Sequence, residues 1–288
     1  MTLPPTPMDR WTSFDLIFFD CDSTLSTLEG IDELARLKGK ELRVGVLTQK
    51  AMDGDLDLAE VYGKRLRALN PTRTQLETIK DRYWETTVPD APEIIAALHW
   101  LQKHVYIISG GLLDAVQGFG ARLGVAPAHI RAVELAYDEL SGEWWRYHDQ
   151  RARGEQRYLD YDEGPLTVTA GKPDIVRQLA GDTWGRRLFI GDGSSDLATQ
   201  DNGVDLFVGF GGVVARKKVE QEAAVFIYSE SLAPLLPLIT GPEAATALRA
   251  SEHAALFERG LALARDTDAV RFNRPGLAQA FRAAFEGL

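Results

Sequence analysis

The sequence has little of the features that define several other protein classes. It holds one cysteine, Cys21, in 288 residues, so neither an internal disulfide nor a cysteine-rich zinc site can form. Its five histidines show no metal-ligand spacing. No apolar run approaches the ~20 residues of a membrane span, and the N-terminus lacks the basic and apolar regions of a secretory signal. We therefore expect a cytoplasmic protein with no membrane partner.

The charge balance is acidic. Lys and Arg total 32 against 42 Asp and Glu, which gives a formal net charge of −10. A surface of this sign repels nucleic acid and anionic membranes, so we expect neither as a partner, although a local basic pocket could still hold a phosphate. The hydrophobic content of 45% is that of an ordinary globular protein.

Short apolar runs alternate with helical patterns along much of the chain. Each run ends in an acid, a serine or a glycine, and the runs are residues 15–20, 104–109, 187–192 and 206–209. Amphipathic helical patterns occupy residues 92–103, 112–123 and 173–179. This alternation predicts an α/β fold, a Rossmann-like parallel sheet with helices on both faces. In such sheets ligands bind beyond the carboxyl ends of the strands.

The first two apolar runs are separated by far more than the ~30 residues of a βαβ unit. The surplus, residues 26–85, consists of helical patterns and predicts an inserted helical-bundle cap over the site. We therefore expect a core of residues 14–25 and 86–237, the cap, and a helical C-terminal extension at 241–288, with helices near 241–265 and 275–287.

Two further segments carry weaker signals. Residues 133–164 are polar and aromatic, and Ser141-Gly142 between alternating flanks predicts a hairpin. In the extension, Leu277, Phe281 and Phe285 form a stripe at helical spacing. Such a stripe must be covered either by the core of this chain or by a second subunit, so a homodimer is one of two expectations.

Two carboxylates follow the first apolar run, in the segment Asp20-Cys21-Asp22-Ser23-Thr24. Taken alone, a solvated acidic turn explains them equally well. Two more acids, Asp192 and Asp196, follow another predicted strand, and one carboxylate from each strand end suits Mg²⁺ with its oxygen ligands. Strand alternation turns Cys21 away from both neighbouring acids, so we expect it to be a small buried filler.

Phosphate chemistry is indicated by two other segments. Ser109-Gly110-Gly111 offers a hydroxyl and backbone N–H groups where a helix is predicted to start, which suits an anion. Lys172 precedes Pro173 at another predicted helix start, and its ammonium can bind phosphate.

Taken together, the segments DCDST, ISGG, GK and GDGSSD resemble the four motifs of the haloacid dehalogenase superfamily of phosphohydrolases. Within it, the chain resembles the phosphoserine phosphatase family through EGIDELA at 29–35, AMDG at 51–54 followed by Arg65-Leu66, and GFGG at 209–212. The resemblance covers roughly residues 14–237.

This resemblance implies a mechanism that the chemistry supports. Asp20 would attack phosphorus to form an aspartyl-phosphate, and Asp22 would protonate the leaving oxygen and then activate water. Mg²⁺ would be bound by Asp20, the backbone carbonyl of Asp22 and Asp192, with Asp196 orienting metal waters or Lys172. The phosphoryl oxygens would be held by Ser109, Gly110, Gly111 and Lys172.

The resemblance also implies a small-molecule substrate, phosphoserine. Glu29 would pair with its ammonium, Arg65 would bind its carboxylate bidentately, and Met52 would give an apolar wall beside it. Taken alone, Glu29 is better explained as a helix-start acid and Arg65 as a solvated helix residue, and the alternative for Met52 is plain cap core.

Some features depart from the family pattern. Val213 stands where an Asn is common, residues 143–171 are long and charged, and the extension has no counterpart in the family's minimal form. Other readings therefore stay open: a phosphotransferase to an alcohol such as homoserine, a phosphatase for another small monoester, or a non-catalytic receiver-like signalling module. The cap and Asp22 argue against the last, because a receiver needs neither a lid nor a leaving-group acid.

Overall fold

The computed structural model describes residues 10–52, 58–146 and 148–287, and only the backbone of 48–52 and 58–59. Its strands are β1 (Leu16–Phe19), β2 (His104–Leu112), β3 (Ile130–Val133), β4 (Leu135–Asp138), β5 (Arg157–Tyr161), β6 (Arg187–Gly191), β7 (Leu206–Phe210), β8 (Val225–Ile227) and β9 (Val270–Phe272). Its helices are α1 (Gly30–Leu37), α2 (Glu41–Met52), α3 (Leu58–Leu69), α4 (Arg73–Glu85), α5 (Ala91–Trp100), α6 (Leu113–Arg122), α7 (Gln150–Gly154), α8 (Lys172–Ala180), α9 (Ser194–Leu197), α10 (Lys217–Glu222), α11 (Leu235–Thr240), α12 (Ala245–Arg249), α13 (Ala254–Arg265) and α14 (Leu277–Ala284). Within these described ranges, no helix is long and apolar enough to cross a membrane.

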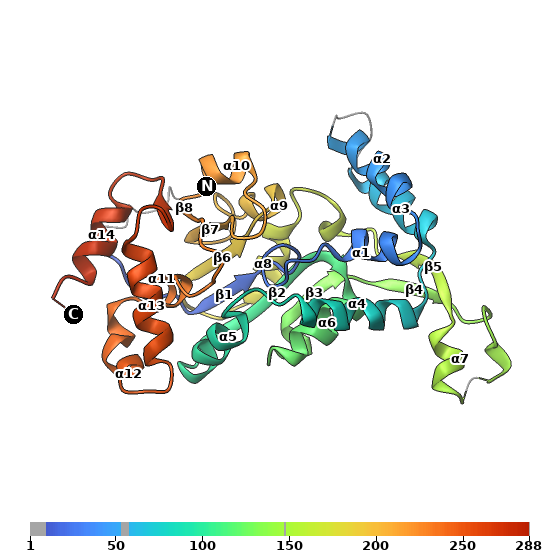
Figure 1. Cartoon of the computed structure of the whole chain (residues 1–288), viewed down its shortest axis with the longest axis horizontal. Helices are drawn as coiled ribbons and strands as arrows, with labels where there is room; N and C mark the ends of the chain where they lie inside the picture. The colour runs from blue at the N-terminus through green and yellow to red at the C-terminus, as the bar shows by residue number, and fades with distance from the viewer. Residues whose placement is uncertain (1–9, 53–57, 147, 288) are drawn as a thin grey trace.

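One large sheet organises the molecule. Its strand order is β3-β2-β1-β6-β7-β8-β9. All neighbouring strands in this order are parallel except the last pair, since the edge strand β9 runs antiparallel to β8. The predicted α/β fold is confirmed (Figure 1). Because Phe19 of β1 is in register with Ile107 of β2 and Ile190 of β6, the residues that follow these strands meet at one edge.

Both faces of the sheet are buried, as expected for parallel strands joined by crossover helices. Leu16 and Phe18 of β1 pack with residues of α8, α9 and α10 on one face. Ile17 and Phe19, which point to the opposite face, pack with residues of α5, α6 and α11. The run of apolar residues in the sequence reflects this two-sided burial.

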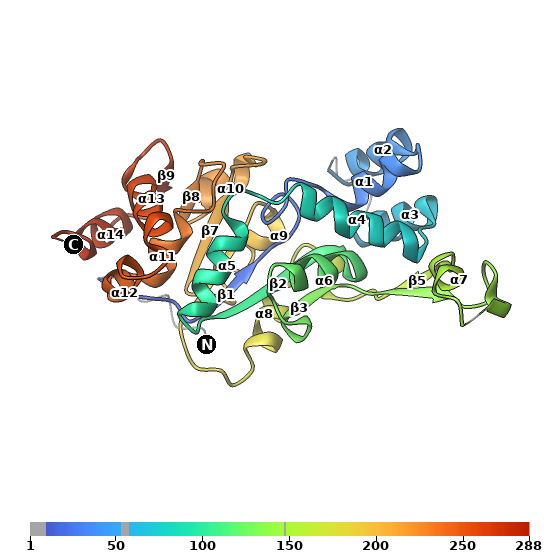
Figure 2. The ribbon, with the colours of Figure 1, turned by 60° about the horizontal axis from the view of Figure 1, so that its bottom comes forward.

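Helices α1 to α4, which fall in the predicted cap, lie at the end of the molecule away from the C-terminal helices (Figures 1 and 2). The two chain segments that connect the cap to the sheet lie side by side. Thr27 N donates to Thr86 O at 2.9 Å, and Val88 N donates to Leu25 O at 2.9 Å. This pairing supports the predicted boundaries of the cap, which stay a prediction.

Strands β4 and β5 form an antiparallel ribbon that reaches away from the sheet and carries α7 near its tip (Figure 2). The predicted hairpin is present as this antiparallel pair, but Ser141-Gly142 is not a turn that joins its strands directly. Residues 139–156 connect the two strands. Ser141 lies near the start of this connection and binds the start of β5, because its Oγ accepts a hydrogen bond from Arg157 N at 2.8 Å.

The C-terminal extension is mainly helical, as predicted, and it also supplies the edge strand β9, which the helical patterns did not predict. The apolar stripe is buried within this chain: Phe281 and Phe285 have no exposed surface and Leu277 is also buried. Trp11 packs edge-on against Phe281, with ring centroids 5.2 Å apart. The stripe is therefore covered without a second subunit.

This packing gives a stability prediction. Phe281→Ala should lower the free energy of unfolding by about 3–5 kcal/mol, because it leaves a cavity under Trp11. Guanidinium unfolding followed by circular dichroism measures it. Leu140→Ala, at a side chain that is 72% exposed, is the control and should change stability by less than about 0.5 kcal/mol. A loss for Phe281→Ala no larger than that of the control would mean that the extension does not unfold with the core.

Candidate active site

The predicted site residues meet at the carboxyl ends of the central strands. Asp20 follows β1, Ser109 lies near the end of β2, and Asp192 follows β6. Helix starts add two more: Lys172 is the first residue of α8, and Asp196 lies in the short helix α9. All of these except Ser109 line a cavity of about 220 Å³, to which the cap residues Ile31, Tyr62 and Arg65 also contribute. The sequence therefore predicted correctly that these strand ends converge.

Lys172 sits at the centre of the buried charges. Its Nζ lies 2.7 Å from Asp20 Oδ1 and 2.5 Å from Asp196 Oδ1. Burial disfavours the charged ammonium, yet the charges of Asp196 and Asp20 together raise the pKa of Lys172. Burial and the charge of Asp20 raise the pKa of Asp196 despite this pairing. Negative charge is thus in excess at the site.

Asp22 presents its two oxygens differently. Oδ1 accepts hydrogen bonds from Gly30 N at 2.7 Å and from Tyr83 Oη at 2.6 Å. Oδ2 faces Ser109, whose Oγ lies 3.3 Å away. Burial and the charge of Asp20 raise the pKa of Asp22, while the Tyr83 and Gly30 hydrogen bonds act in the opposite direction. A carboxyl with a raised pKa is suited to carry a proton at neutral pH.

Arg216, which the sequence analysis did not single out, joins the two halves of the site. Its Nε donates to Asp192 Oδ2 at 2.7 Å, and its Nη2 donates to Glu29 Oε1 at 3.1 Å. The same Glu29 oxygen accepts from Ser23 Oγ at 2.8 Å. Ser23 has a left-handed φ of 53°, a conformation unusual for a residue other than glycine. Burial and the charge of Asp20 raise the pKa of Asp192, although Arg216 opposes this.

The cap contributes Arg65 and Tyr62 from α3. Arg65 lines the cavity, and its buried Nε has no hydrogen-bond partner among the described residues. Its guanidinium lies 5.7 Å from the centre of the Tyr62 ring. The Tyr62 hydroxyl donates to Gly110 O at 3.0 Å and so links the cap to the end of β2. The side chain of Met52 lies outside the described residues.

The glycines after Ser109 differ from expectation in one respect. They belong to the irregular end of β2, and α6 begins only at Leu113, so they do not form the first turn of that helix. The Gly111 N–H already donates to Ser109 Oγ at 2.9 Å, so it is not an open donor as predicted. A Cβ at Gly111 would lie 2.9 Å from Asp22 Oδ2, which explains why a glycine is needed here.

Three of the acids could hold a metal ion. Asp20, Asp192 and Asp196 are all buried, and each offers a carboxylate oxygen within 4.8 Å of the others. Asp196 is the most fully occupied of the three, since its Oδ1 binds Lys172 and its Oδ2 accepts from Gly193 N at 2.9 Å. Asp20 and Asp192 are therefore the freer oxygen donors. Mutual repulsion of buried carboxylates is what a bound cation would relieve.

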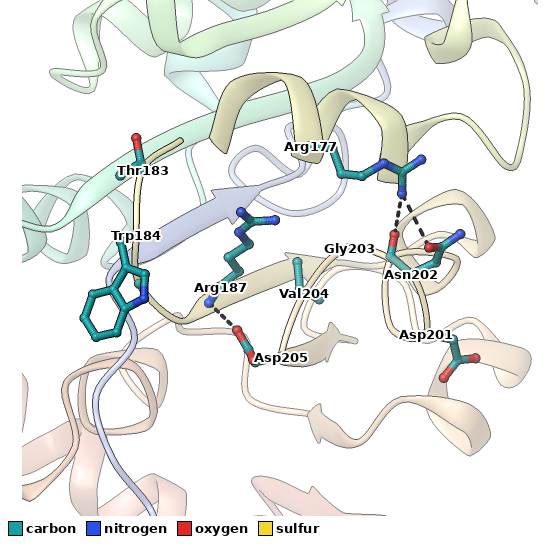
Figure 3. A pocket seen from close by; sticks show the side chains of 10 residues that line it. Arg177, Thr183, Trp184, Arg187, Asp201, Asn202, Gly203, Val204 and Asp205 are labelled. Carbon is teal, nitrogen blue, oxygen red and sulfur yellow. Dashed lines mark hydrogen bonds between the residues drawn. The ribbon is translucent and has the colours of Figure 1, made fainter. Parts of the chain in front are cut away.

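A larger cavity of about 470 Å³ lies at the opposite end of the strands, where β6 and β7 begin (Figure 3). None of its lining residues is buried. Its charged groups are held by local contacts: Arg177 binds Asn202 O at 3.0 Å, and Arg187 N binds Asp205 Oδ2 at 2.7 Å. The buried, crowded carboxylates of the smaller cavity make it the better candidate for chemistry.

The comparisons with known proteins agree with this geometry. The chain is 30% identical over 217 residues to a phosphoserine phosphatase of Mus musculus. The aligned region covers 75% of this chain and 89% of that protein. It is 32% identical over 229 residues to a chloroplastic phosphoserine phosphatase of Arabidopsis thaliana, spanning 78% of this chain and 72% of the relative. A scan of protein-family models finds no match.

Solved structures give the same picture. A phospho-aspartyl intermediate analogue of phosphoserine phosphatase superposes with a TM-score of 0.63 at 25% identity, covering 80% of this chain and all of that one. A substrate-bound phosphoserine phosphatase complex gives the same score and identity over 78% of this chain and 98% of that one. Fold and site together define a phosphohydrolase of the haloacid dehalogenase superfamily. The chain belongs to the phosphoserine phosphatase family.

The sequence analysis missed three residues that shape the site: Tyr62, Tyr83 and Arg216. The two tyrosines lie on the buried faces of cap helices and belong to no recognisable sequence motif. Only the packing of the cap shows that they reach the site. Arg216 did carry a signal, because it follows the GFGG segment beyond the end of β7, where a strand-end residue can reach the site.

The buried charge arrangement gives a second prediction. Lys172→Met should lower the free energy of unfolding by about 3–5 kcal/mol in the presence of a chelator, because it leaves Asp20 and Asp196 buried without their cation. Denaturant unfolding measures the change. Lys217→Met, which removes an exposed lysine, should stay within about 0.5 kcal/mol of the wild type. Equal stability of the two variants would contradict the central place given to Lys172.

Proposed function

We propose that this protein is a Mg²⁺-dependent phosphatase that hydrolyses O-phospho-L-serine through an aspartyl-phosphate on Asp20. The observation that carries the proposal is the constellation in one buried pocket. Asp20 is held by Lys172, Asp22 stands two residues further with a raised pKa, and Asp192 completes an oxygen-lined site. The family membership supports phosphate monoesters as the substrate class.

Each residue of the constellation has a distinct role in the proposed reaction. The Asp20 carboxylate attacks phosphorus, and its new bond to phosphorus forms as the bond from phosphorus to the serine oxygen breaks. Asp22 gives a proton to that oxygen. Water then attacks the aspartyl-phosphate after Asp22 takes one of its protons, which releases phosphate and restores Asp20. Lys172 holds the nucleophile and offers its positive charge to the phosphoryl oxygens, with Ser109 and Gly110 as further hydrogen-bond donors to those oxygens, while the Gly111 N–H is taken up by Ser109 Oγ.

The donor set fits a hard divalent cation. Asp20, Asp192 and the backbone carbonyl of Asp22 would hold Mg²⁺, since carboxylate and carbonyl oxygens are the ligands it takes. When bound, Mg²⁺ neutralises phosphate charge and favours in-line displacement. Asp196, with one oxygen on Lys172 and the other on the Gly193 N–H, would orient Lys172.

The distal part of the pocket suits a zwitterionic amino acid. Glu29 offers a carboxylate to the substrate ammonium, and the unpartnered Nε of Arg65 points to an anion such as a carboxylate. Arg216 holds Glu29 at 3.1 Å, so a substrate ammonium would share that carboxylate with it. Met52 stays a predicted wall of the same pocket.

The function is tested by phosphate release from a panel of small monoesters with Mg²⁺, with and without homoserine as acceptor. We expect O-phospho-L-serine to be turned over with the highest kcat/KM and phosphate to appear in equal amount with serine. Asp20→Asn, which removes the nucleophile, should abolish turnover. Phosphate recovered on homoserine would instead indicate a phosphotransferase, and a preferred ester without an amino acid moiety would overturn the substrate.

Substrate selectivity gives a further prediction. Arg65→Ala should lower kcat/KM for O-phospho-L-serine by about 10²-fold or more, because the substrate carboxylate loses its cationic partner. A monoester without a carboxylate, such as phosphoethanolamine, should lose far less. Arg67→Ala is a matched control, since this exposed arginine lies on the same helix outside the cavity. An unchanged ratio between the two substrates would remove Arg65 from substrate binding.

Metal dependence should vary with pH in a defined direction. Without a cation, the pKa of Asp192 is raised to about 7 and that of Asp196 to about 8, above the value of ~4 in the unfolded chain. Between the unfolded and the folded pKa values, the folded state holds more protons than the unfolded state. Its stability therefore falls as the pH rises through this window. Cation binding needs ionised ligands, so its stabilisation grows over the same window.

The measurement is the midpoint of thermal unfolding in Mg²⁺ and in a chelator at pH 5 and pH 8. We expect Mg²⁺ to raise the midpoint by about 5 °C at pH 8, as binding at a hundred times Kd does, and by clearly less at pH 5. Asp192→Asn should remove most of the effect. Equal shifts at both pH values would contradict the coupling of metal and protons.

A further inference from the structure

Asp22 has two oxygens in unlike surroundings. Oδ1 accepts two short hydrogen bonds, from Gly30 N at 2.7 Å and from Tyr83 Oη at 2.6 Å. Oδ2 has the hydroxyl of Ser109 at 3.3 Å and lies over Gly111, where no side chain fits. A carboxyl can present either oxygen when its last side-chain bond turns, so two donors on one oxygen select one orientation.

The second of these donors is held firmly in place. Tyr83 belongs to the cap helix α4 and has no exposed surface. Its ring stacks on Phe119 of α6, with centroids 5.5 Å apart and planes at 25°. A phenol carries its proton at neutral pH, so the Tyr83 hydroxyl is a donor to the Asp22 carboxylate.

Gly30 provides the room that this contact requires. A Cβ at position 30 would lie 2.2 Å from Tyr83 Oη and 3.0 Å from the ring carbon that bears it. The absent side chain lets the backbone N–H and the phenol reach the same oxygen of Asp22. The two donors come from the first turn of α1 and from the last turn of α4, so they tie the acid of the core to both ends of the cap.

We propose that Tyr83 is a positioning residue that fixes the Asp22 carboxyl with Oδ2 toward the substrate, so that Oδ2 is the oxygen that gives and takes the proton. This rests on the proposed function, because it presupposes that Asp22 is the acid. As the phosphorus–serine oxygen bond breaks and the bond from Asp20 to phosphorus forms, the proton on Oδ2 passes to the serine oxygen. In the second step Oδ2 takes a proton from water as that water attacks phosphorus. Tyr83 keeps its own proton throughout.

The test compares a substrate that needs the proton with one that does not. Serine leaves as an alkoxide unless it is protonated, whereas p-nitrophenolate leaves without help. Tyr83→Phe should therefore lower kcat/KM for O-phospho-L-serine by about 10- to 100-fold, the cost of a misplaced catalytic group, and lower that for p-nitrophenyl phosphate by less than about 3-fold. Asp22→Asn should show the same selectivity, and adding Tyr83→Phe to it should cause no further loss.

Tyr137→Phe is the matched control. Tyr137 is also a buried tyrosine whose hydroxyl donates at 2.6 Å to a carboxylate, that of Asp114, but it lies outside the cavity. It should lose a similar amount of stability and leave the ratio of the two kcat/KM values unchanged. If Tyr83→Phe fails to fold, Gly30→Ala replaces it, because its methyl group occupies the position of the hydroxyl and should give the same selective loss.

The outcomes separate this inference from the proposed function. A wild-type protein active on phosphoserine, with a Tyr83→Phe ratio equal to that of Tyr137→Phe, overturns the role of Tyr83 alone. Equal losses on both substrates do the same, since they are what a disturbed fold produces. A wild-type protein that hydrolyses p-nitrophenyl phosphate and no alkyl monoester overturns the proposed function, and with it the inference.

Discussion

The ion triad of Lys172 with Asp20 and Asp196 is the interaction on which the rest of the site depends. Five acids from the ends of two strands and the start of the cap line a cavity of about 220 Å³, and four of them have raised pKa values. Lys172 and Arg216 are the cations that line the same cavity beside Arg65. Charge this crowded is costly to bury unless it is paired. In the proposed reaction, the remaining excess of negative charge is the property that would draw a divalent cation, and with it the phosphate ester, into the pocket.

The cap does more than cover this pocket. Two tyrosine hydroxyls from the cap bind core groups within it, Tyr62 at Gly110 O and Tyr83 at Asp22 Oδ1. Arg216 makes the reverse connection, from the core to Glu29 at the start of the cap. Each of these contacts joins a residue of the cap to a group of the core that lies at the pocket. Movement of the cap would therefore change the geometry of the chemistry itself, and would not only open and close access.

Much of this arrangement could be predicted from the sequence. The contacts that could not be predicted depend on residues far apart in the chain. Apolar runs that end in Asp20 and Asp192 mark buried parallel strands, and parallel strands bring their carboxyl ends together whatever lies between them. Lys172 was found because a helix start followed by proline is a local pattern. Tyr83 shows no such pattern, since its partner is 61 positions away and is reached only when α4 packs on α6. The edge strand β9 was not predicted for the same reason, because its three residues form a strand only through their pairing with β8.

The position of β9 also shows that the apolar packing of the extension lies away from the charged pocket. The sheet runs from β3 to β9, with the acid-bearing ends of β1 and β6 near its centre, and Trp11 and Phe281 both pack against Phe272 of the edge strand β9. Trp11 Nε1 donates to Leu238 O at 3.0 Å, so the start of the chain is fastened to the same region as its end. An active centre that concentrates unfavourable buried charge needs a stable frame that does not share its constraints. The extension supplies apolar burial at that edge, and none of its residues lines the pocket.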